Sequence, residues 1–193
     1  MSMLHPGAAV EYELRIVLRD ITPPIWRLLR VPGTITLQDL HGVLQMVMGW
    51  TNSHLYTFHF DGKEYSDPDP EWEIPIEDAT AVTLAALVGE AGSLVYEYDL
   101  GDYWLHDITA HEVPTDGLVK GIRCLGGERA CPPEDCGGVD GFERLLEALD
   151  DSEDDEHQEM VTWAGDFDPE RFELAAVNRA LGRYRRRYSK RAV

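Results

Sequence analysis

The stretch CLGGERACPPEDCGG holds all three cysteines of this 193-residue chain, and its residue types could form a metal site. Cys131 and Cys136 have four residues between them, the wide end of the spacing that zinc-binding pairs use, and Cys124 offers a third thiolate. His106 or His54 would complete a Cys₃His zinc site, in which the metal deprotonates the thiols and stabilises the loop. The alternative is an ordered loop, because glycines supply positive φ angles and adjacent prolines fix the path of the chain.

The same stretch is a poor setting for a nucleophilic cysteine. A cysteine nucleophile needs a base and a lowered pKa, whereas the neighbouring Glu128, Glu134 and Asp135 favour the protonated thiol. In an ordered loop, an acidic side chain at position 134 or 135 would hydrogen-bond to backbone amides. We therefore expect a rigid loop that packs beside the Asp99–His106 hairpin and helps to shape a cleft.

A second stretch that could carry chemistry is YEYDLGDYWLHD, residues 96–107. Asp99 and Asp102 flank a turn, and His106 shares the strand parity of Asp102, so two carboxylates and an imidazole can meet at one end of a hairpin. Such a group can hold a divalent cation that activates water, or it can act as an acid and base pair. The alternative is that Asp and Gly only form the turn while His106 lies at the edge of the core.

The elements that would position these residues follow from hydrophobic periodicity. Alternating apolar residues predict strands at 10–19 and 25–31, and helical spacing predicts a helix over 37–48 between a Thr36 cap and Gly49. His41 falls on the apolar stripe of that helix, either as a hydrogen-bonded core histidine or as a ligand. The other expected elements are hairpins at 54–66 and 93–113 and helices at 83–89, at 142–149 and from 169 onward, with the acidic run 150–159 as a solvated turn or helix face.

This order of elements predicts an α+β fold. We expect an antiparallel or mixed sheet with a β-grasp-like strand–strand–helix–strand order, followed by C-terminal helices. The length of 193 residues and the hydrophobic content of 44% favour a single domain over residues 1–193, with its core at about 10–181.

The net charge of −19 is unevenly distributed along the chain. Six of the 17 basic residues lie in the tail 183–193, which has no acidic residue. The rest of the chain is strongly acidic and repels phosphate backbones, so contact with nucleic acid is expected only through this tail. The sequence has neither a membrane-length apolar run nor a signal peptide, and it has an odd number of cysteines. We expect a cytoplasmic protein that does not contact membranes and has no structural disulfide.

Several separated motifs resemble those of the plasmid pRiA4b ORF-3-like family, whose members also occur as passengers of mobile elements. The motifs are PPIWRLLRVPGTITLQDLHGVLQMVMGW, HLYTFHF, YEYDLGDYWLHDI, CLGGERACPPEDCGG and WAGDFDPERFELAAVNRAL. The resemblance implies a compact α+β protein and brings no established activity. The family pattern assigns no role to its motif positions, which are Trp26, Arg27, His41, Trp50, His54, Asp99, Gly101, Asp102, Trp104, His106, Arg129, Pro132, Pro133, Glu134, Asp135 and Trp163.

Two functions remain open at this point. The first is a non-enzymatic module that binds a partner protein, a peptide or nucleic acid in an aromatic and acidic cleft. Its candidate residues are Trp26, Arg27, His41, Trp50, His54, Asp99, Asp102, Trp104, His106, Glu134 and Asp135. The alternative is a metal-dependent hydrolase or nuclease that uses Asp99, Asp102 and His106, with His54 or Glu134 as a further ligand and zinc as a possible cation.

Overall fold

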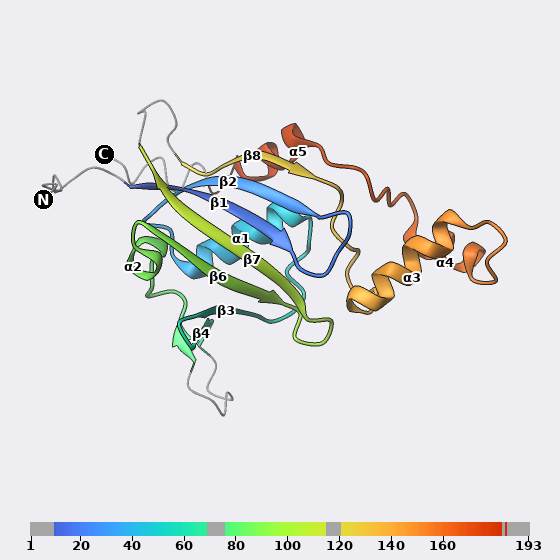
Figure 1. Ribbon diagram of the computed structural model, residues 1–193, viewed down its shortest axis with the longest axis horizontal. Coiled ribbons are helices and arrows are strands. Elements are labelled where there is room, and N and C mark those ends of the chain that lie inside the picture. The colour runs from blue at the N-terminus through green and yellow to red at the C-terminus, as the bar shows by residue number, and fades with distance from the viewer. Residues whose placement is uncertain (1–9, 69–75, 115–120, 183, 185–193) are drawn as a thin grey trace, which may run out of the picture.

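The structure, a computed structural model, describes residues 10–68, 76–114, 121–182 and 184 and folds them around one eight-stranded sheet (Figure 1). The strands are β1 (Glu11–Leu18), β2 (Trp26–Pro32), β3 (Tyr56–Phe60), β4 (Lys63–Ser66), β5 (Glu77–Asp78), β6 (Ala91–Tyr98), β7 (Trp104–Val113) and β8 (Arg123–Glu128). The helices are α1 (Leu37–Met48), α2 (Leu84–Val88), α3 (Gly138–Asp150), α4 (His157–Ala164) and α5 (Leu174–Ala180).

The strands lie in the order β5-β4-β3-β6-β7-β1-β2-β8. All neighbouring pairs are antiparallel except β4 and β5, so the sheet is mixed, as the sequence predicts. The β-grasp-like order is not confirmed. The strand after α1, β3, does not join the β1–β2 hairpin, because two strands, β6 and β7, lie between it and β1. The local pattern of elements contains no information on this long-range pairing.

Helix α1 covers one face of the sheet, and its bounds agree with the predicted helix (Figure 1). Thr36 accepts a hydrogen bond from the backbone N–H of Asp39, and Gly49 ends the helix with a φ angle of 97°, which glycine adopts without steric cost. The apolar stripe of α1 packs on the inward-facing residues of the strands, for example Leu14, Ile16 and Phe58. This core fixes the ends of the strands from which the loops of the candidate site emerge.

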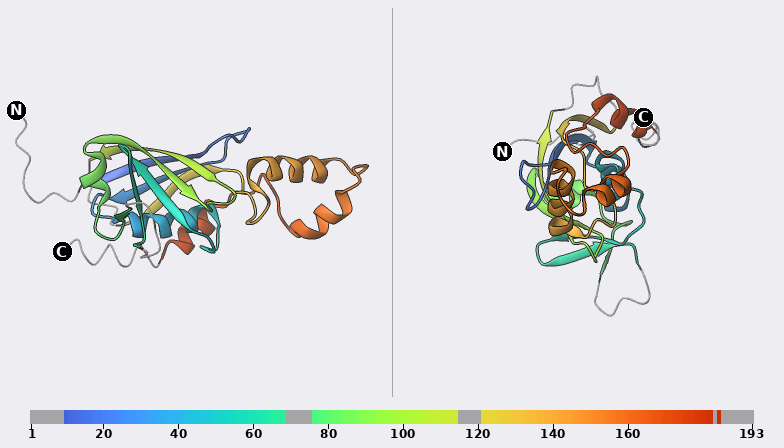
Figure 2. Two further views of the ribbon diagram at one scale, coloured as in Figure 1. Left: turned by 90° about the horizontal axis from the view of Figure 1, so that it is seen from below. Right: turned by 90° about the vertical axis from the view of Figure 1, so that its right-hand side faces the viewer.

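The C-terminal third of the chain departs from the predicted elements. The first residues of the cysteine stretch form strand β8 rather than a loop, since they pair with β2. The acidic run forms a mostly exposed turn and the start of α4, which agrees with the predicted solvated turn or helix face. Helix α4 pairs with α3 in an arm that projects from one end of the sheet (Figure 2).

The last helix starts at Leu174 rather than at residue 169. The carbonyl of Pro169 accepts a hydrogen bond from Ala130, and Asp168 caps a turn at Glu170, so this segment is held to the loop after β8. The side chain of Asn178 then fixes α5 on β8 through both backbone polar groups of Cys124.

Two further expectations concern the basic tail and membrane-spanning helices. The basic tail 183–193 lies outside the described residues apart from Tyr184, so nucleic-acid contact through it stays a prediction. Within the described part of the chain, no helix combines the length and the apolar character that crossing a bilayer requires.

Candidate functional site

Three loops from distant parts of the sequence meet at one end of the sheet: the α1–β3 loop, the β6–β7 turn and the β8–α3 loop. Trp50 Nε1 donates to the carbonyl of Pro132 at 3.0 Å, which joins the first loop to the third. The backbone N–H of Gly137 donates to Asp102 Oδ2 at 3.1 Å, which joins the third loop to the turn. The second half of the cysteine stretch therefore packs beside the β6–β7 hairpin.

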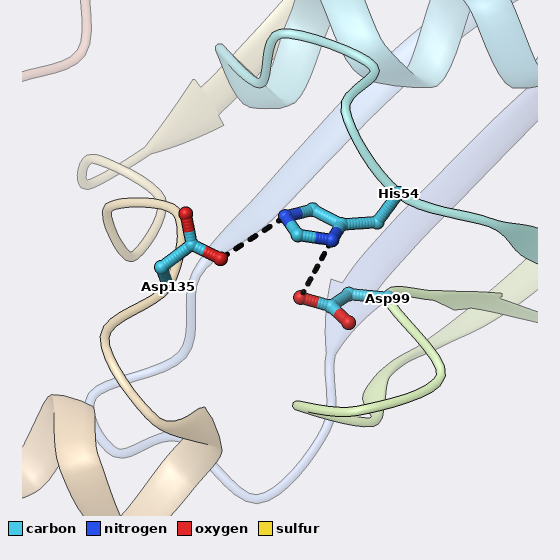
Figure 3. A group of neighbouring side chains, drawn as sticks. All are labelled: His54, Asp99 and Asp135. Carbon is cyan, nitrogen blue, oxygen red and sulfur yellow. Dashed lines mark ion pairs between the residues drawn. The ribbon is translucent and has the colours of Figure 1, made fainter.

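The meeting point of the loops is a cluster of one imidazole and three carboxylates, which we call the His54 cluster (His54, Asp99, Glu134 and Asp135). Figure 3 shows the imidazole ring of His54 between Asp99 and Asp135. His54 Nδ1 lies 3.6 Å from Asp99 Oδ2, and His54 Nε2 lies 3.2 Å from Asp135 Oδ1 and 3.5 Å from Glu134 Oε2. The two ring nitrogens thus face different carboxylates.

Local hydrogen bonds set the positions of the acidic residues. Asp99 Oδ1 accepts the backbone N–H groups of Gly101 and Asp102 at 3.0 and 3.4 Å, the hydrogen-bonding pattern of an aspartate at a turn. Glu134 Oε1 accepts a backbone N–H from Thr51 at 2.6 Å and the hydroxyl of Tyr98 at 3.0 Å. These bonds leave Asp99 Oδ2 and Glu134 Oε2 directed toward the imidazole ring.

The electrostatics of the His54 cluster are unbalanced. The ion pairs that described residues make with Asp99, Glu134 and Asp135 are all with His54, so one imidazole faces three carboxylates. His54 Nε2 is buried and has no hydrogen-bond partner among the described residues, although two carboxylate oxygens lie nearby. Asp99 is 8% exposed, whereas the side chain of Asp135 is 75% exposed, so the cluster opens to solvent on the Asp135 side.

This arrangement has the donor atoms of a divalent-cation site. One ligand atom each from His54, Asp99 and Asp135 lie within 4.8 Å of one another, and among the described residues they are the one group of three or more His, Cys, Asp and Glu that meets this criterion. An imidazole nitrogen with carboxylate oxygens suits cations such as Zn²⁺ or Mn²⁺.

The predicted Asp99, Asp102 and His106 group is corrected by the structure. His106 lies inside the core with no exposed surface, and its Nδ1 donates to the carbonyl of Tyr96 at 3.1 Å. Burial lowers the pKa of His106 to about 4. The side chain of Asp102 instead holds the backbone of Gly137. The imidazole that meets Asp99 therefore comes from the α1–β3 loop, because strand β7 turns His106 into the sheet's interior.

The predicted Cys₃His zinc site is also corrected, because the three thiols do not form a ligand group with each other, with His106 or with His54. Cys124 Sγ donates to Gly126 O at 3.3 Å, and Cys131 Sγ lies 3.9 Å from the guanidinium of Arg27. Burial raises the pKa of Cys131 and of Cys136 to about 12, which agrees with the expectation that neither is a nucleophile. The spacing of the cysteines did not predict a zinc site correctly, because Cys124 lies in strand β8 whereas Cys131 and Cys136 lie in the loop that follows it.

Of the two interpretations of His41, a hydrogen-bonded core histidine or a ligand, the structure supports the first. His41 also borders a cavity. Its ring stacks on Tyr56 at a centroid distance of 3.7 Å, and its two nitrogens contact Tyr96 Oη at 2.8 Å and Asn52 Oδ1 at 2.6 Å. Burial lowers the pKa of His41 to about 4. His41 and His54 line the same cavity, of about 450 Å³.

The tryptophans and Arg27 do not join the His54 cluster. Trp104 is buried in the core, and Trp26 Nε1 donates to Glu128 on the edge of the sheet. Arg27 is buried, and its guanidinium donates to four backbone carbonyls. Trp50 lies closer to the cluster, since it holds the first loop to Pro132 and lines a groove that also includes Glu134.

Sequence reasoning missed two residues of the site. Tyr98 positions Glu134 and lies edge-on to His54 at 5.9 Å between ring centroids. Asp67 borders the cavity next to His54. The position of Tyr98 directly before Asp99 was a usable signal, whereas nothing in the sequence places Asp67 near His54.

The family model for plasmid pRiA4b ORF-3-like protein matches residues 10–176. The chain belongs to this family. It is 37% identical over 183 residues to the uncharacterised protein y4hQ of Sinorhizobium fredii, with 93% of this chain and 94% of that protein covered. The crystal structure of MM3350, a protein of unknown function from Methanosarcina mazei Go1, has a TM-score of 0.80 at 35% identity and covers 86% of this chain and 97% of its own.

These comparisons confirm the family resemblance and the α+β class. Neither relative has an assigned activity, so membership in the family identifies no reaction and no ligand. The chemistry of the His54 cluster has to be argued from its own atoms.

Proposed function

We propose that this protein is a divalent-cation-dependent hydrolase whose cation is held by the His54 cluster. The observation that carries the proposal is that His54 Nε2, a buried nitrogen with no hydrogen-bond partner among the described residues, lies 3.2 Å from Asp135 Oδ1 and 3.5 Å from Glu134 Oε2. A cation there would offset the repulsion between three carboxylates and would give His54 Nε2 a partner.

The two sides of the imidazole suggest a division of roles. His54 Nε2 would bind the cation together with Glu134 and Asp135, both of which face it. His54 Nδ1 faces the buried Asp99, and a hydrogen bond from a histidine ligand to a carboxylate fixes the ring and raises its basicity. A bound cation would lower the pKa of a coordinated water and so make hydroxide available for hydrolysis.

The first experiment measures cation binding. Protein treated with chelator is titrated with ZnCl₂ and MnCl₂ by calorimetry, and bound metal is counted by elemental analysis. We expect one cation per chain and a loss of affinity of about 100-fold or more in His54→Gln. Failure of the wild-type protein to bind either cation would overturn the proposal.

The chain offers a matched control in His59. This histidine also lies between two carboxylates, with Nε2 at 2.7 Å from Glu97 and Nδ1 at 3.8 Å from Glu64, but it belongs to no group of three ligands. His59→Gln should leave cation affinity unchanged. An equal loss in both variants would mean that the His54 cluster is not the binding site.

The second experiment tests hydrolysis. The cation-loaded protein is assayed with p-nitrophenyl esters of acetate and phosphate and with p-nitroanilides of amino acids. We expect turnover of at least one class that requires the cation and is lost in His54→Gln. Cation binding without turnover of any class would favour the second candidate below.

The second candidate is a binding module that uses the cation only to hold its ligand. It is favoured by a groove of about 650 Å³ between the end of α1, the loop 130–134 and the segment 164–177. Apolar side chains such as Trp50, Phe167 and Phe172 line this groove, and Glu134 lies at its margin. A groove of this kind suits an apolar segment of a peptide or partner protein.

A further inference from the structure

The arm formed by α3 and α4 contains a pocket that borders the His54 cluster. The pocket has a volume of about 290 Å³, and its walls are residues 135–136 of the β8–α3 loop together with side chains of both helices. All of its lining residues belong to the continuous described segment 121–182. One of them is Asp135, whose Oδ1 lies 3.2 Å from His54 Nε2. A molecule bound at the proposed cation site therefore has this pocket as its neighbour.

The pocket has apolar walls, to which Leu145, Met160 and Trp163 contribute. Leu145 is 1% exposed and belongs to the core, whereas Trp163 is 49% exposed and presents much of its indole ring to solvent. An indole ring offers a flat apolar surface on which another ring can pack, and a methionine sulfur makes favourable contacts with aromatic rings. The walls therefore suit an aromatic group.

The charges around the pocket disfavour an anionic group. Arg144 lines it, but its guanidinium donates to Asp154 at 2.8 Å and to Glu156 at 2.9 Å, so its charge is already paired. Asp135 and Glu159 add negative charge at the walls. A group of either charge would also lose hydration against the apolar side chains. An uncharged group is the occupant that fits these walls.

We propose that this pocket is the specificity subsite of the hydrolase and binds an uncharged aromatic ring of the substrate, with Trp163 as the specificity-determining residue. The proposal rests on the proposed function and names its substrate class: esters or amides with an aromatic group next to the bond that is cleaved. The volume of about 290 Å³ accommodates one ring and its linker rather than a helix of a partner protein.

The first test compares two probes that bind a divalent cation through the same group. Phenylacetohydroxamate and acetohydroxamate differ only by a phenyl ring. Calorimetry with Zn²⁺-loaded wild-type protein should give about tenfold or tighter binding of the phenyl probe, because its ring leaves water on entering the pocket. Equal affinity for the two probes would overturn the proposal.

Variants of α4 assign the preference to one side chain. Trp163→Ala should remove most of the preference for the phenyl probe and leave the affinity for acetohydroxamate unchanged. Val161→Ala is the matched control, since Val161 is an exposed apolar residue of the same helix that does not line the pocket, and it should keep the preference. Full retention of the preference in Trp163→Ala would contradict the assignment.

A measurement without the cation separates this proposal from the proposed function. In chelator-treated wild-type protein with ¹⁵N-labelled tryptophan, phenylacetamide should shift the indole N–H resonance of Trp163, and acetamide should not. This shift, together with failure to bind Zn²⁺ or Mn²⁺, would leave the pocket assignment standing and remove the hydrolase. Cation binding with neither the shift nor a preference between the hydroxamates would do the reverse.

The alternative occupant of the pocket is a second copy of the chain. Analytical ultracentrifugation of the wild-type protein and of Trp163→Ala distinguishes the two. A monomer that prefers the phenyl probe supports the proposal. A dimer that Trp163→Ala converts to a monomer, with no preference for the phenyl probe in either protein, would assign the exposed indole to contact between copies and overturn it.

Discussion

His106 and His54 belong to two different regions of one fold. His106 is fully buried in strand β7, where it contacts Trp50 and Tyr96 and has a pKa of about 4 because burial disfavours its charge. His54 lies in the loop before β3, with 27% of its side chain exposed and three carboxylates around its ring. The first region, the interior, keeps its polar groups neutral or fully hydrogen-bonded, whereas the second, the His54 cluster, gathers like charges.

The difference shows where this fold can carry chemistry. Inside the sheet charged groups are surrounded by structural partners, for example the four carbonyls around Arg27, and His106, whose buried Nε2 has no hydrogen-bond partner among the described residues, stays neutral. Between the loops three carboxylates converge on a single imidazole, and this is where we propose that a cation binds. Interior variants should therefore change stability, and variants of the His54 cluster should change cation binding.

The strongest test of the interior is Arg27→Met. The variant leaves the carbonyls of Trp26, Val47, Glu128 and Arg129 without their donor, and we expect a loss of about 3 to 5 kcal/mol in the free energy of unfolding. Urea denaturation measures the loss. Arg19→Met, which removes an exposed ion pair with Asp107, should cost about 1 kcal/mol or less. Similar losses in the two variants would contradict the contrast.

Stability should also fall with acid because of the interior histidines. The folded pKa of His41 and of His106 is about 4, below the ordinary value of 6.5, so the unfolded chain binds protons first as the pH falls. Their contribution to stability is complete above pH 6.5 and is lost between pH 6.5 and 4, at up to about 3 kcal/mol for each histidine. Denaturation at a series of pH values should show this slope, and His106→Phe should flatten it by about half. An unchanged slope in that variant would place the effect elsewhere.

Asp99→Asn tests the buried side of the His54 cluster. The amide keeps an oxygen for the backbone N–H groups of Gly101 and Asp102 but removes the charge that faces His54 Nδ1. We expect cation affinity to fall about 10- to 100-fold with little loss of thermal stability. Calorimetry and a thermal melt measure the two quantities on one sample. A large fall in melting temperature with unchanged affinity would assign Asp99 to the turn alone.

The smallest expected effect comes from Tyr98→Phe, at the boundary between the two regions. Its hydroxyl donates to Glu134 and accepts a hydrogen bond from the backbone of Ser53, while its ring stacks on Trp50. Removal of the hydroxyl should cost about 1 kcal/mol of stability and should weaken cation binding a few-fold, because Glu134 loses one of its two anchors. Unchanged cation affinity would show that Thr51 alone positions Glu134.

Most of the secondary structure was predictable because its signals are local. The α1 boundaries follow from Thr36, Gly49 and the spacing of leucines between them. The two hairpins follow from alternating residues around the Asp61-Gly62 turn and the Leu100-Gly101-Asp102 turn. The last helix was placed too early, since Asp168 and Pro169 form a cap-like pair whose backbone is instead bonded to Ala130. A contact 39 positions away along the chain outweighed the local signal there.

The sequence by itself determined which residues have the chemistry, and these include His54, Asp99, Glu134 and Asp135. It could not determine that His54 rather than His106 meets the carboxylates, because this depends on the strand order and on which face of β7 turns inward. Local periodicity fixes helices and strands, whereas the His54 cluster depends on contacts between residues 45 to 81 positions apart. Only the tertiary structure brings those atoms together, because the packing of the core decides where each strand ends.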